Sequence, residues 1–546
     1  TKQRYINWWN HKGIILSMWE HFQEGVKPHA DIAPPAPARD LSQKWFDPQW
    51  RAEYLDWYVA HSSLMADMLP VANTQLGPGS LAAILGGVFE GGEDTIWIHP
   101  DPNFNDEIVF NPEHPNWLLH KELLKACKAK ANGNYFVGMP DLMEGLDVLA
   151  ALKGTDMVLL DTVMQPEVLE QQMQQINDIY FKVFDELYDI IREGDEMAFC
   201  YFSSWAPGKM SKLQSDISTM ISQDDYRRFV QPFIREQCQK IDYTLYHLDG
   251  VGAMHHLPAL LEIEELNAIQ WTPGVGEPQG GSPKWYDLYK KILAGGKSVM
   301  ACWVTLEELK PLLDHIGADG VHLEMDFHNE REVEQAMRII EEYTGSSSSV
   351  SADVHTNQPV GEQDNAQESI RIREEKSQEE DRMKPLYDAI VAGKLEPAVE
   401  VTKDAIAAGV LPQDIINGYM ITAMGEVGQR FQDGKAFVPQ LLMAGRAMKG
   451  ALELLKPLLA GNASATIGKI VIGTVKGDLH DIGKNLVASM LEGCGFEVIN
   501  IGIDVTCDKF VEAVKENKAD ILCMSALLTT TMTYMQDVIR ALEEAG

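Results

Sequence analysis

The residue pattern best suited to metal chemistry lies near the C-terminus, in the run Asp478-Leu479-His480-Asp481-Ile482-Gly483. An apolar run at 469–474, typical of a buried strand, precedes it, and a helical pattern at 483–492 follows. Ligands of open α/β sheets bind where loops leave the carboxyl ends of strands. A loop histidine beside an aspartate fits a metal ligand whose second ring nitrogen donates to that carboxylate. The pattern therefore predicts a metal ligand at His480, oriented by Asp478.

The same run resembles the DxHxxG signature of methionine synthase-type cobalamin-binding domains, and Ser525-Ala526-Leu527 resembles their second motif, SxL. The resemblance implies that His480 replaces the cofactor's own base as the lower ligand of cobalt. It also implies that Ser525 contacts the buried nucleotide tail and that Thr531 extends the relay from Asp478. The other residues expected at this corrinoid site are Asp481, Gly483, Leu527 and Thr529.

The elements around this motif predict two parts of a corrinoid module. Apolar spacing predicts four helices, at 385–392, 395–408, 411–430 and 439–458, which would form a cap over 383–461. Strand and helix patterns alternate over 466–546 and predict a Rossmann-like cobalamin-binding domain. Its C-terminal end is expected to be missing, because only three strand–helix units precede Gly546.

Residues 425–441 of the predicted helices resemble the cap that shields the upper face of cobalt in methyltransferase-type corrinoid proteins. The resemblance assigns Phe437 to this cover. A dry apolar lid would limit side reactions of reduced cobalt. Most other apolar positions of these helices are expected to form the core of the bundle.

Residues 1–343 alternate short apolar runs with helical patterns, at 166–191, 223–241, 285–294 and 330–343 among others. This alternation predicts a (β/α)8 TIM barrel, with an open doubly wound sheet as the alternative. Nine runs are strand candidates, one more than a barrel needs: Gly13–Trp19, Met68–Ala72, Tyr135–Met139, Met157–Leu160, Met197–Phe202, Tyr243–Leu248, Ala268–Trp271, Val299–Trp303 and Val321–Met325.

Polar residues follow several of these predicted strands, at the ends where barrel active sites lie. They are His247, Asp249, Glu277 and Glu324. The region resembles the uroporphyrinogen decarboxylase fold family, which includes corrinoid-dependent methyltransferases. The zinc-dependent members carry HxC where this chain has His247-Leu248-Asp249, which makes His247 and Glu324 the candidate zinc ligands. Because Asp249 replaces the cysteine, such a site would be harder and less suited to thiolate chemistry.

Three tryptophans, Trp205, Trp271 and Trp303, lie near the ends of predicted strands. They would either line the substrate site as an aromatic wall or pack in the core. A wall of this kind would suit an aryl methyl ether or a quaternary ammonium group.

The composition excludes several classes of partner. Acidic residues outnumber basic ones by 81 to 46, for a formal net charge of −35, which argues against binding to nucleic acid or to anionic membranes. Seven cysteines without a CxxC pair predict a reducing, cytoplasmic location. Residues 344–382 contain no aromatic side chain other than histidine and many serine and glutamate residues, and are expected to form a flexible acidic linker.

Together these features predict a corrinoid-dependent methyltransferase fused to its own corrinoid protein. The methyl group of an O-, S- or N-methyl compound would pass to or from cobalt, through Co(I) and methyl-Co(III). His247, Asp249, Glu277 or Glu324 would polarise or protonate the leaving heteroatom. A separate methyl-acceptor enzyme and a reductive activator of cobalt would be its partners.

Two other functions remain open at this stage. Adenosylcobalamin-dependent mutases also join a barrel to a DxHxxG domain, but they would not need the predicted helical cap. A non-catalytic cobalamin sensor could combine helices with a Rossmann-like domain. The acidic charge and the absence of a DNA-binding segment weigh against the sensor.

Overall fold

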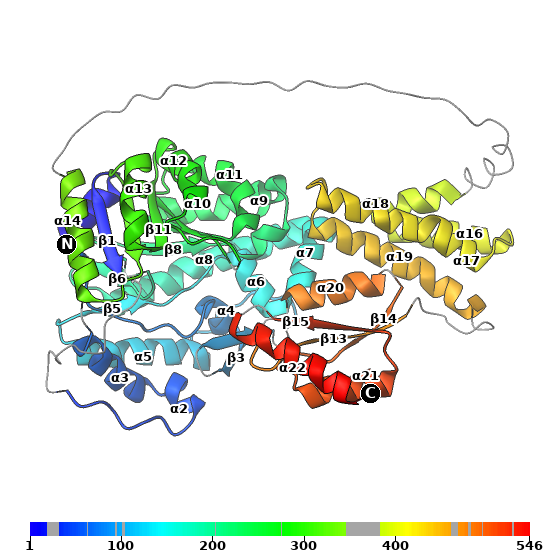
Figure 1. Cartoon of the computed structure of the whole chain (residues 1–546), viewed down its shortest axis with the longest axis horizontal. Coiled ribbons are helices and arrows are strands. Elements are labelled where there is room, and N and C mark those ends of the chain that lie inside the picture. Colours follow the sequence, from blue (N-terminus) through cyan, green and yellow to red (C-terminus); the bar gives the residue numbers. More distant parts are fainter. Residues whose placement is uncertain are drawn as a thin grey trace. The chain divides into compact units, whose positions relative to one another are not determined.

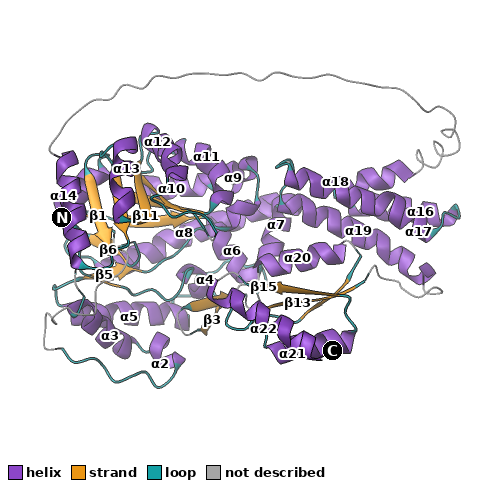
Figure 2. Ribbon diagram, viewed as in Figure 1, coloured by secondary structure: helices purple, strands orange, loops and turns teal. Residues whose placement is uncertain are grey.

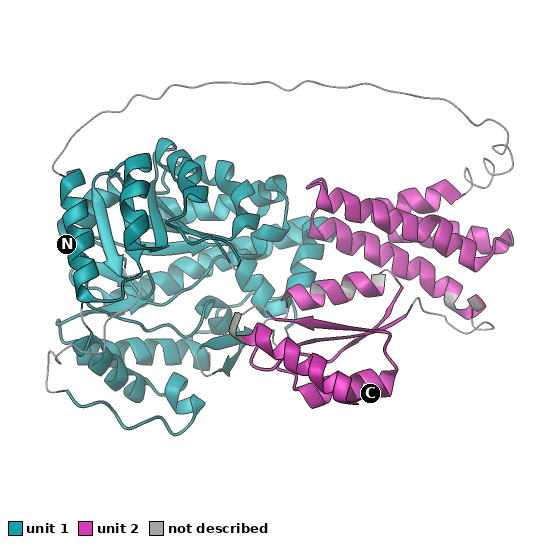
Figure 3. Ribbon diagram, in the orientation of Figure 1, with its two compact units in different colours: residues 1–347 teal, residues 348–546 magenta. Residues whose placement is uncertain are grey.

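The computed structural model of the chain (Figure 1) describes residues 1–18, 32–62, 64–92, 95–100, 104–202, 204–274, 276–344, 383–459, 468–478, 482–493, 495–526 and 529–545. It divides into two compact units, Thr1–Ser347 and Ser348–Gly546 (Figure 3). The predicted linker, 344–382, lies outside the described residues apart from Thr344. No helix in the described part of the chain is long and apolar enough to cross a membrane.

The first unit alternates strands with helices along the chain (Figure 2). Its strands are β1 (Ile14–Met18), β2 (Val71–Ala72), β3 (Val88–Gly91), β4 (Ile96–His99), β5 (Phe136–Met139), β6 (Met197–Phe199), β7 (Trp205–Ala206), β8 (Met210–Gln214), β9 (Tyr243–Asp249), β10 (Ala268–Thr272), β11 (Ser298–Val304) and β12 (Val321–Met325). Its helices are α1 (Lys2–Trp9), α2 (Leu41–Phe46), α3 (Pro48–Ala60), α4 (Ser80–Ile84), α5 (Pro115–Ala131), α6 (Gly145–Lys153), α7 (Thr155–Met164), α8 (Pro166–Ile191), α9 (Gln223–Phe229), α10 (Gln231–Lys240), α11 (Leu257–Leu261), α12 (Tyr286–Ala294), α13 (Leu306–Ile316) and α14 (Glu330–Thr344). Short 3₁₀ turns lie at η1 (Ile217–Met220), η2 (Val251–His256) and η3 (Pro283–Trp285).

Six parallel strands form the main sheet, in the order β1-β12-β11-β10-β9-β8. A second sheet has the order β2-β5-β6-β7, in which β7 is antiparallel to β6. The first strand of the unit therefore pairs with its last, as closure of a barrel would require. Strands β3 and β4 form a separate antiparallel pair. Hydrogen bonds among the described strands therefore leave three sheets in this unit, and the closed TIM barrel stays a prediction.

Most of the predicted strands are present, but the prediction of a strand at Met157–Leu160 was wrong. These residues lie inside α7, which buries Val158 and Leu159 and exposes Met157. A short apolar run cannot by itself distinguish a strand from a buried helix turn. Strand β8 was not predicted, because the polar residues Ser211, Lys212 and Gln214 interrupt its apolar pattern although all three are buried.

The second unit contains a helical bundle. A helix over 383–391 is followed by α16 (Leu395–Ala407), α17 (Pro412–Ile415), the π-helical turn η4 (Ile416–Met420), α18 (Ile421–Gln432) and α19 (Val438–Leu459). The bundle buries apolar side chains that include Leu386, Ile390, Met420, Met448 and Leu455. The four stretches expected from apolar spacing are thus helical, with a π-helical turn inside the third.

A three-stranded parallel sheet completes the second unit. Its strands, in the order β14-β13-β15, are β14 (Glu497–Asn500), β13 (Lys469–Thr474) and β15 (Ile521–Ser525). Helices α20 (Ile482–Gly493), α21 (Cys507–Asn517) and α22 (Thr529–Ala545) alternate with these strands. This arrangement is Rossmann-like, as predicted.

Candidate functional site

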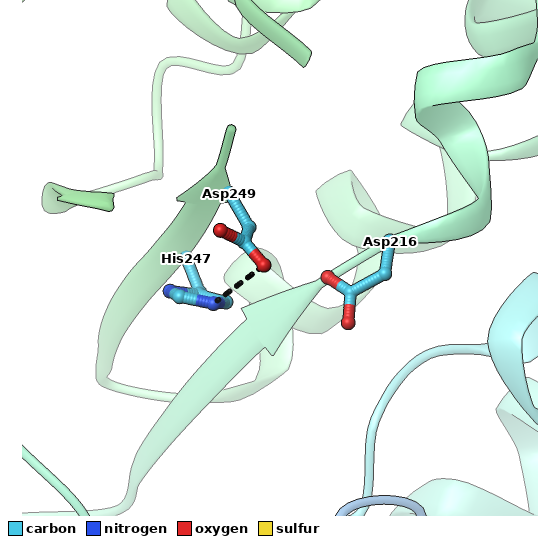
Figure 4. Close-up of side chains that lie close together, drawn as sticks. All are labelled: Asp216, His247 and Asp249. Atoms are coloured by element: carbon cyan, nitrogen blue, oxygen red, sulfur yellow. Dashed lines mark ion pairs between the residues drawn. The ribbon is translucent and has the colours of Figure 1, made fainter. Parts of the chain in front are cut away.

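Three polar side chains meet at the ends of two neighbouring strands of the first unit: Asp216, His247 and Asp249 (Figure 4). One ligand atom from each lies within 4.8 Å of the others, and His247 Nε2 is 3.9 Å from Asp249 Oδ2. His247 and Asp249 share one face of β9 because they are two residues apart. Asp216 follows β8, the parallel neighbour of β9. We call these residues the Asp–His–Asp group.

Helix α6 fixes the loop that carries Asp216. The Asp147 carboxylate accepts hydrogen bonds from the backbone N–H groups of Asp216 and Ile217, each at 2.9 Å. The Gln214 side chain donates to Asp216 Oδ2, also at 2.9 Å. Asp216 was not predicted as a site residue because β8, the strand before it, was not predicted. The polar run Gln214-Ser215-Asp216 is the feature of the sequence that could have indicated a strand end at this point.

The surroundings of the Asp–His–Asp group shift its protonation. Burial and, to a smaller extent, the nearby Lys212 ammonium lower the pKa of His247 to about 3, so the imidazole is neutral at pH 7. The surrounding protein atoms raise the pKa of Asp216 to about 7, although the residue keeps contact with solvent. The Lys212 ammonium opposes this rise, and repulsion from the Asp249 carboxylate adds to it. Burial also raises the pKa of Asp249. The group therefore tends to keep a proton on its carboxyls.

Two further side chains, Lys212 and Phe202, lie near the group. The Lys212 ammonium lies 2.5 Å from Asp141 Oδ2 in a buried ion pair, so that carboxylate balances most of its charge. The Phe202 ring packs beside His247, with ring centroids 5.4 Å apart. Phe202 has a φ of 55°, a strained conformation for a bulky residue, and such residues cluster at functional sites.

The donor set of the group fits a divalent metal ion. One imidazole nitrogen and two carboxylate oxygens resemble catalytic sites with three protein ligands and an open position. Glu324, expected from the sequence as a candidate zinc ligand with His247, is not part of this group. It lies in β12 beside Cys302, is 1% exposed, and burial raises its pKa to about 8.

The remaining residues predicted for this site lie elsewhere. Glu277 follows β10 and pairs with the Lys284 ammonium. Trp205 and Trp271 are buried, and Trp271 packs edge-on against Trp285 with centroids 5.1 Å apart. The structure thus favours core packing over an aromatic wall for these two tryptophans.

In the second unit, the side chain of Asp478 is fully buried beside β13. Thr531 Oγ1 donates a hydrogen bond to Asp478 Oδ2 at 2.7 Å. Asp504 holds the loop that carries Asp478, since Gly477 N donates to Asp504 Oδ1 at 2.8 Å and Asp504 N donates to Asp478 O at 3.2 Å. The Asp478 carboxylate therefore sits at the carboxyl end of the central strand with a fixed orientation.

Two other predicted corrinoid residues, Ser525 and Gly483, lie within the described part of this domain. Ser525 ends β15 and is the register partner of Thr474 on β13. Gly483 is exposed in the first turn of α20, with no other atom within 4 Å of the position of an added Cβ. His480, Asp481, Leu527 and the side chain of Thr529 lie outside the described residues.

Phe437 immediately precedes α19 and is half-buried. Its backbone N–H donates to Gln440 Oε1 at 2.9 Å. Leu441, on the next turn, packs with Val427, Ala436 and Ala444 in the core of the bundle. The structure thus separates Leu441, a core residue, from Phe437, which retains exposed surface.

Comparisons with known proteins match the second unit. Families described as B12 binding domain match residues 383–456 and 468–546. Trimethylamine corrinoid protein 1 of Methanosarcina mazei is 45% identical over 161 residues, which make up 29% of this chain and 74% of that protein. Dimethylamine corrinoid protein 3 of Methanosarcina acetivorans is 43% identical over 159 residues, with the same shares.

The chain belongs to the corrinoid proteins. Cobalamin or a related corrinoid is therefore its cofactor, as the DxHxxG and SxL resemblances implied. We call residues 383–546 the corrinoid module. A solved structure of the methanol:cobalamin methyltransferase complex of Methanosarcina barkeri is 32% identical, covers 33% of this chain and 70% of that chain, and has a TM-score of 0.28.

Proposed function

We propose that the chain transfers a methyl group between a methylated small molecule and the corrinoid that it carries. One observation supports this most directly: the chain that contains the corrinoid module also contains a unit whose Asp216, His247 and Asp249 meet at strand ends. Such strand ends are where α/β enzymes bind substrates. The relatives named for trimethylamine and dimethylamine support small methylated compounds as the methyl donors.

The architecture that we propose has three parts. Residues 1–343 form a TIM-barrel methyltransferase domain, which the pairing of β1 with β12 supports. Residues 383–461 form the cap, and residues 466–546 form the cobalamin-binding domain. Residues 344–382 tether them, so that one corrinoid reaches the substrate at a high effective concentration.

The Asp–His–Asp group would orient and protonate the leaving heteroatom. Bound corrinoid supplies a nucleophilic cobalt that accepts the methyl group. The heteroatom keeps the electron pair of its broken bond to carbon and takes a proton from the Asp216 or Asp249 carboxyl. Neutral His247 orients the heteroatom through Nε2. We assign no proton transfer to Glu277 or Glu324, since the first is ion-paired with Lys284 and the second is buried.

Zinc at this position remains a second form of the same proposal. His247 Nε2 and one oxygen each of Asp216 and Asp249 would hold the ion. It would polarise the heteroatom as a Lewis acid, in place of proton donation. Either form leaves the same three side chains in contact with the reacting part of the substrate.

In the corrinoid module, Asp478 would orient His480 as the lower ligand of cobalt, and Thr531 would hold the Asp478 carboxylate. Ser525, with Leu527 and Thr529, would line the nucleotide slot, and Asp481 and Gly483 would complete the loop. Phe437 would cover the opposite face of the corrin. The chain would also need a separate methyl-acceptor enzyme and a reductive activator of the cobalt.

The test uses the full chain loaded with corrinoid and reduced to Co(I). A panel of methyl ethers, methylthiols, methylamines and methyl halides is added, and the visible spectrum is followed for the change that marks methylation of cobalt. We expect at least one donor to react faster with the holoprotein than with free reduced cobalamin. Failure of every donor to exceed the free-cofactor rate would contradict the proposal. Turnover with adenosylcobalamin instead would indicate a mutase, and corrinoid binding without any reaction would indicate a sensor.

A further inference from the structure

Three polar side chains outside the proposed reaction extend from His247 across the sheet. Gln270 is completely buried in β10 and is the direct register partner of His247 in β9. Cys302 in β11 and Glu324 in β12 are likewise register partners of each other and are buried. Four adjacent strands therefore place polar groups side by side, in a row that steps by two residues between β10 and β11, where Gln270 is the register partner of Met300. Apolar side chains would cost less to bury in this region.

The contacts along this row determine the orientation of the Gln270 amide. Its nitrogen donates to Thr272 Oγ1 at 2.8 Å and to Cys302 Sγ at 3.1 Å. The Cys302 side chain is in turn hydrogen-bonded with the Glu324 carboxyl. In this orientation both amide hydrogens have an acceptor, Thr272 Oγ1 and Cys302 Sγ. The amide oxygen therefore faces His247 Nδ1, with which it is hydrogen-bonded.

This orientation decides which nitrogen of His247 carries the proton. An amide oxygen can only accept a hydrogen bond, so Nδ1 must be the protonated nitrogen. In a ring protonated at Nδ1 alone, the second nitrogen, Nε2, bears a lone pair. Nε2 is the atom that lies 3.9 Å from Asp249 Oδ2.

We propose that Gln270 is a positioning residue that holds His247 in the Nδ1-protonated tautomer, so that Nε2 presents a lone pair beside Asp216 and Asp249. Cys302 and Glu324 secure this arrangement by fixing the amide. The lone pair of Nε2 is then available to a bound metal ion or to a polar hydrogen of the substrate. The inference rests on the proposed function only for the identity of that bound group.

Solid-state ¹⁵N NMR of the full chain, labelled at the histidine side chains, reads the tautomer without any methyl donor. The chain has 15 histidines, so the signals of His247 are identified as those that disappear in the His247→Gln variant. We expect the unaltered chain to show one protonated nitrogen, Nδ1, and one unprotonated nitrogen, Nε2. A His247 ring protonated at Nε2 would overturn the proposal directly, even if every Gln270 variant failed to fold.

Substitutions then test the cause. In Gln270→Met, which removes the acceptor, we expect a second set of His247 signals from the Nε2-protonated tautomer. In Gln270→Glu, a carboxylate oxygen still accepts from Nδ1, so the single Nδ1-protonated form should return. The matched control is Gln237→Met, because Gln237 is also buried and bonded, to Asn177 at 2.9 Å, but lies in α10. An unchanged tautomer in folded Gln270→Met would overturn the positioning role.

This result is separable from the proposed function. If no methyl donor reacts but the tautomer follows Gln270, the positioning role stands and the methyl-transfer proposal fails. If a donor reacts, Gln270→Met should slow methyl transfer at least tenfold and Gln270→Glu should restore most of the rate, whereas Gln237→Met should have little effect.

Discussion

Thr531 donates a 2.7 Å hydrogen bond to Asp478, which joins the first turn of α22 to the loop after β13. The two residues are 53 positions apart, so only the parallel sheet brings them together. A carboxylate held in this way keeps one orientation. The proposed role of Asp478 as the hydrogen-bond partner of His480 requires such an orientation.

Replacement of Thr531 by valine should weaken the binding of His480 to cobalt. One hydrogen bond to a charged group contributes about 1.5–3 kcal/mol, so we expect the fraction of corrinoid with a histidine lower ligand to fall about tenfold or more. The visible spectrum of the full chain loaded with methylcobalamin measures this fraction. Thr531→Ser should retain it, and the exposed Thr533→Val is the control. Equal spectra for Thr531→Val and the unaltered chain would contradict the relay.

Replacement of Asp216 by asparagine should slow methyl transfer by about 100-fold, the lower end of the effect of general acid catalysis. The rate constant is read from the loss of Co(I) with a donor that reacts with the unaltered chain. The control is Asp224→Asn, an exposed aspartate of α9 outside the Asp–His–Asp group. If both variants react at the unaltered rate, Asp216 takes no part in the reaction.

The sequence predicted the corrinoid module far better than it predicted the site of the first unit. The module depends on local motifs and on regular apolar spacing, and β13 begins and ends where the apolar run at 469–474 placed it. The site of the first unit lies at the end of β8, and this strand is hard to recognise in the sequence because it contains the polar but buried residues Lys212 and Gln214. Since Asp216 follows β8, the missed strand also hid a site residue. Buried polar groups that pair across strands do not produce the regular alternation of apolar and polar residues from which a strand is predicted.

The same limitation explains why Glu324 was expected at the reacting centre. It ends a strand and is acidic, which are the only properties visible in the sequence. Whether a strand-end carboxyl faces the site or a neighbouring strand depends on register, and register pairs Glu324 with Cys302 and Ser17. The structure therefore places it in the row that holds Gln270 instead.

Removal of the Glu324 carboxyl should change how stability depends on pH. Its pKa rises from 4.5 to about 8 in the folded chain, so the folded state binds the proton more tightly than the unfolded state does. Stability should then fall as the pH rises from about 4.5 to about 8, by an amount on the order of a few kcal/mol. Glu324→Gln removes this contribution, so its unfolding midpoint in urea should fall less between pH 5 and pH 8. The midpoint of the exposed Glu334→Gln variant should change with pH as that of the unaltered chain does. If the midpoints of all three proteins change equally with pH, Glu324 does not contribute to the pH dependence of stability.

Removal of Lys212 should destabilise the first unit, because the Asp141 carboxylate would be left buried and unpaired. The two side chains are only 3% and 7% exposed, and loss of one partner of such a pair costs about 3–5 kcal/mol. Lys212→Met should therefore lower the urea midpoint strongly, and the double variant Lys212→Met/Asp141→Asn should regain much of the loss. Lys310→Met is the control, since its partner Asp314 is exposed and the pair contributes about 0–1 kcal/mol. Equal midpoints for Lys212→Met and Lys310→Met would mean that β8 does not bury Lys212 against Asp141.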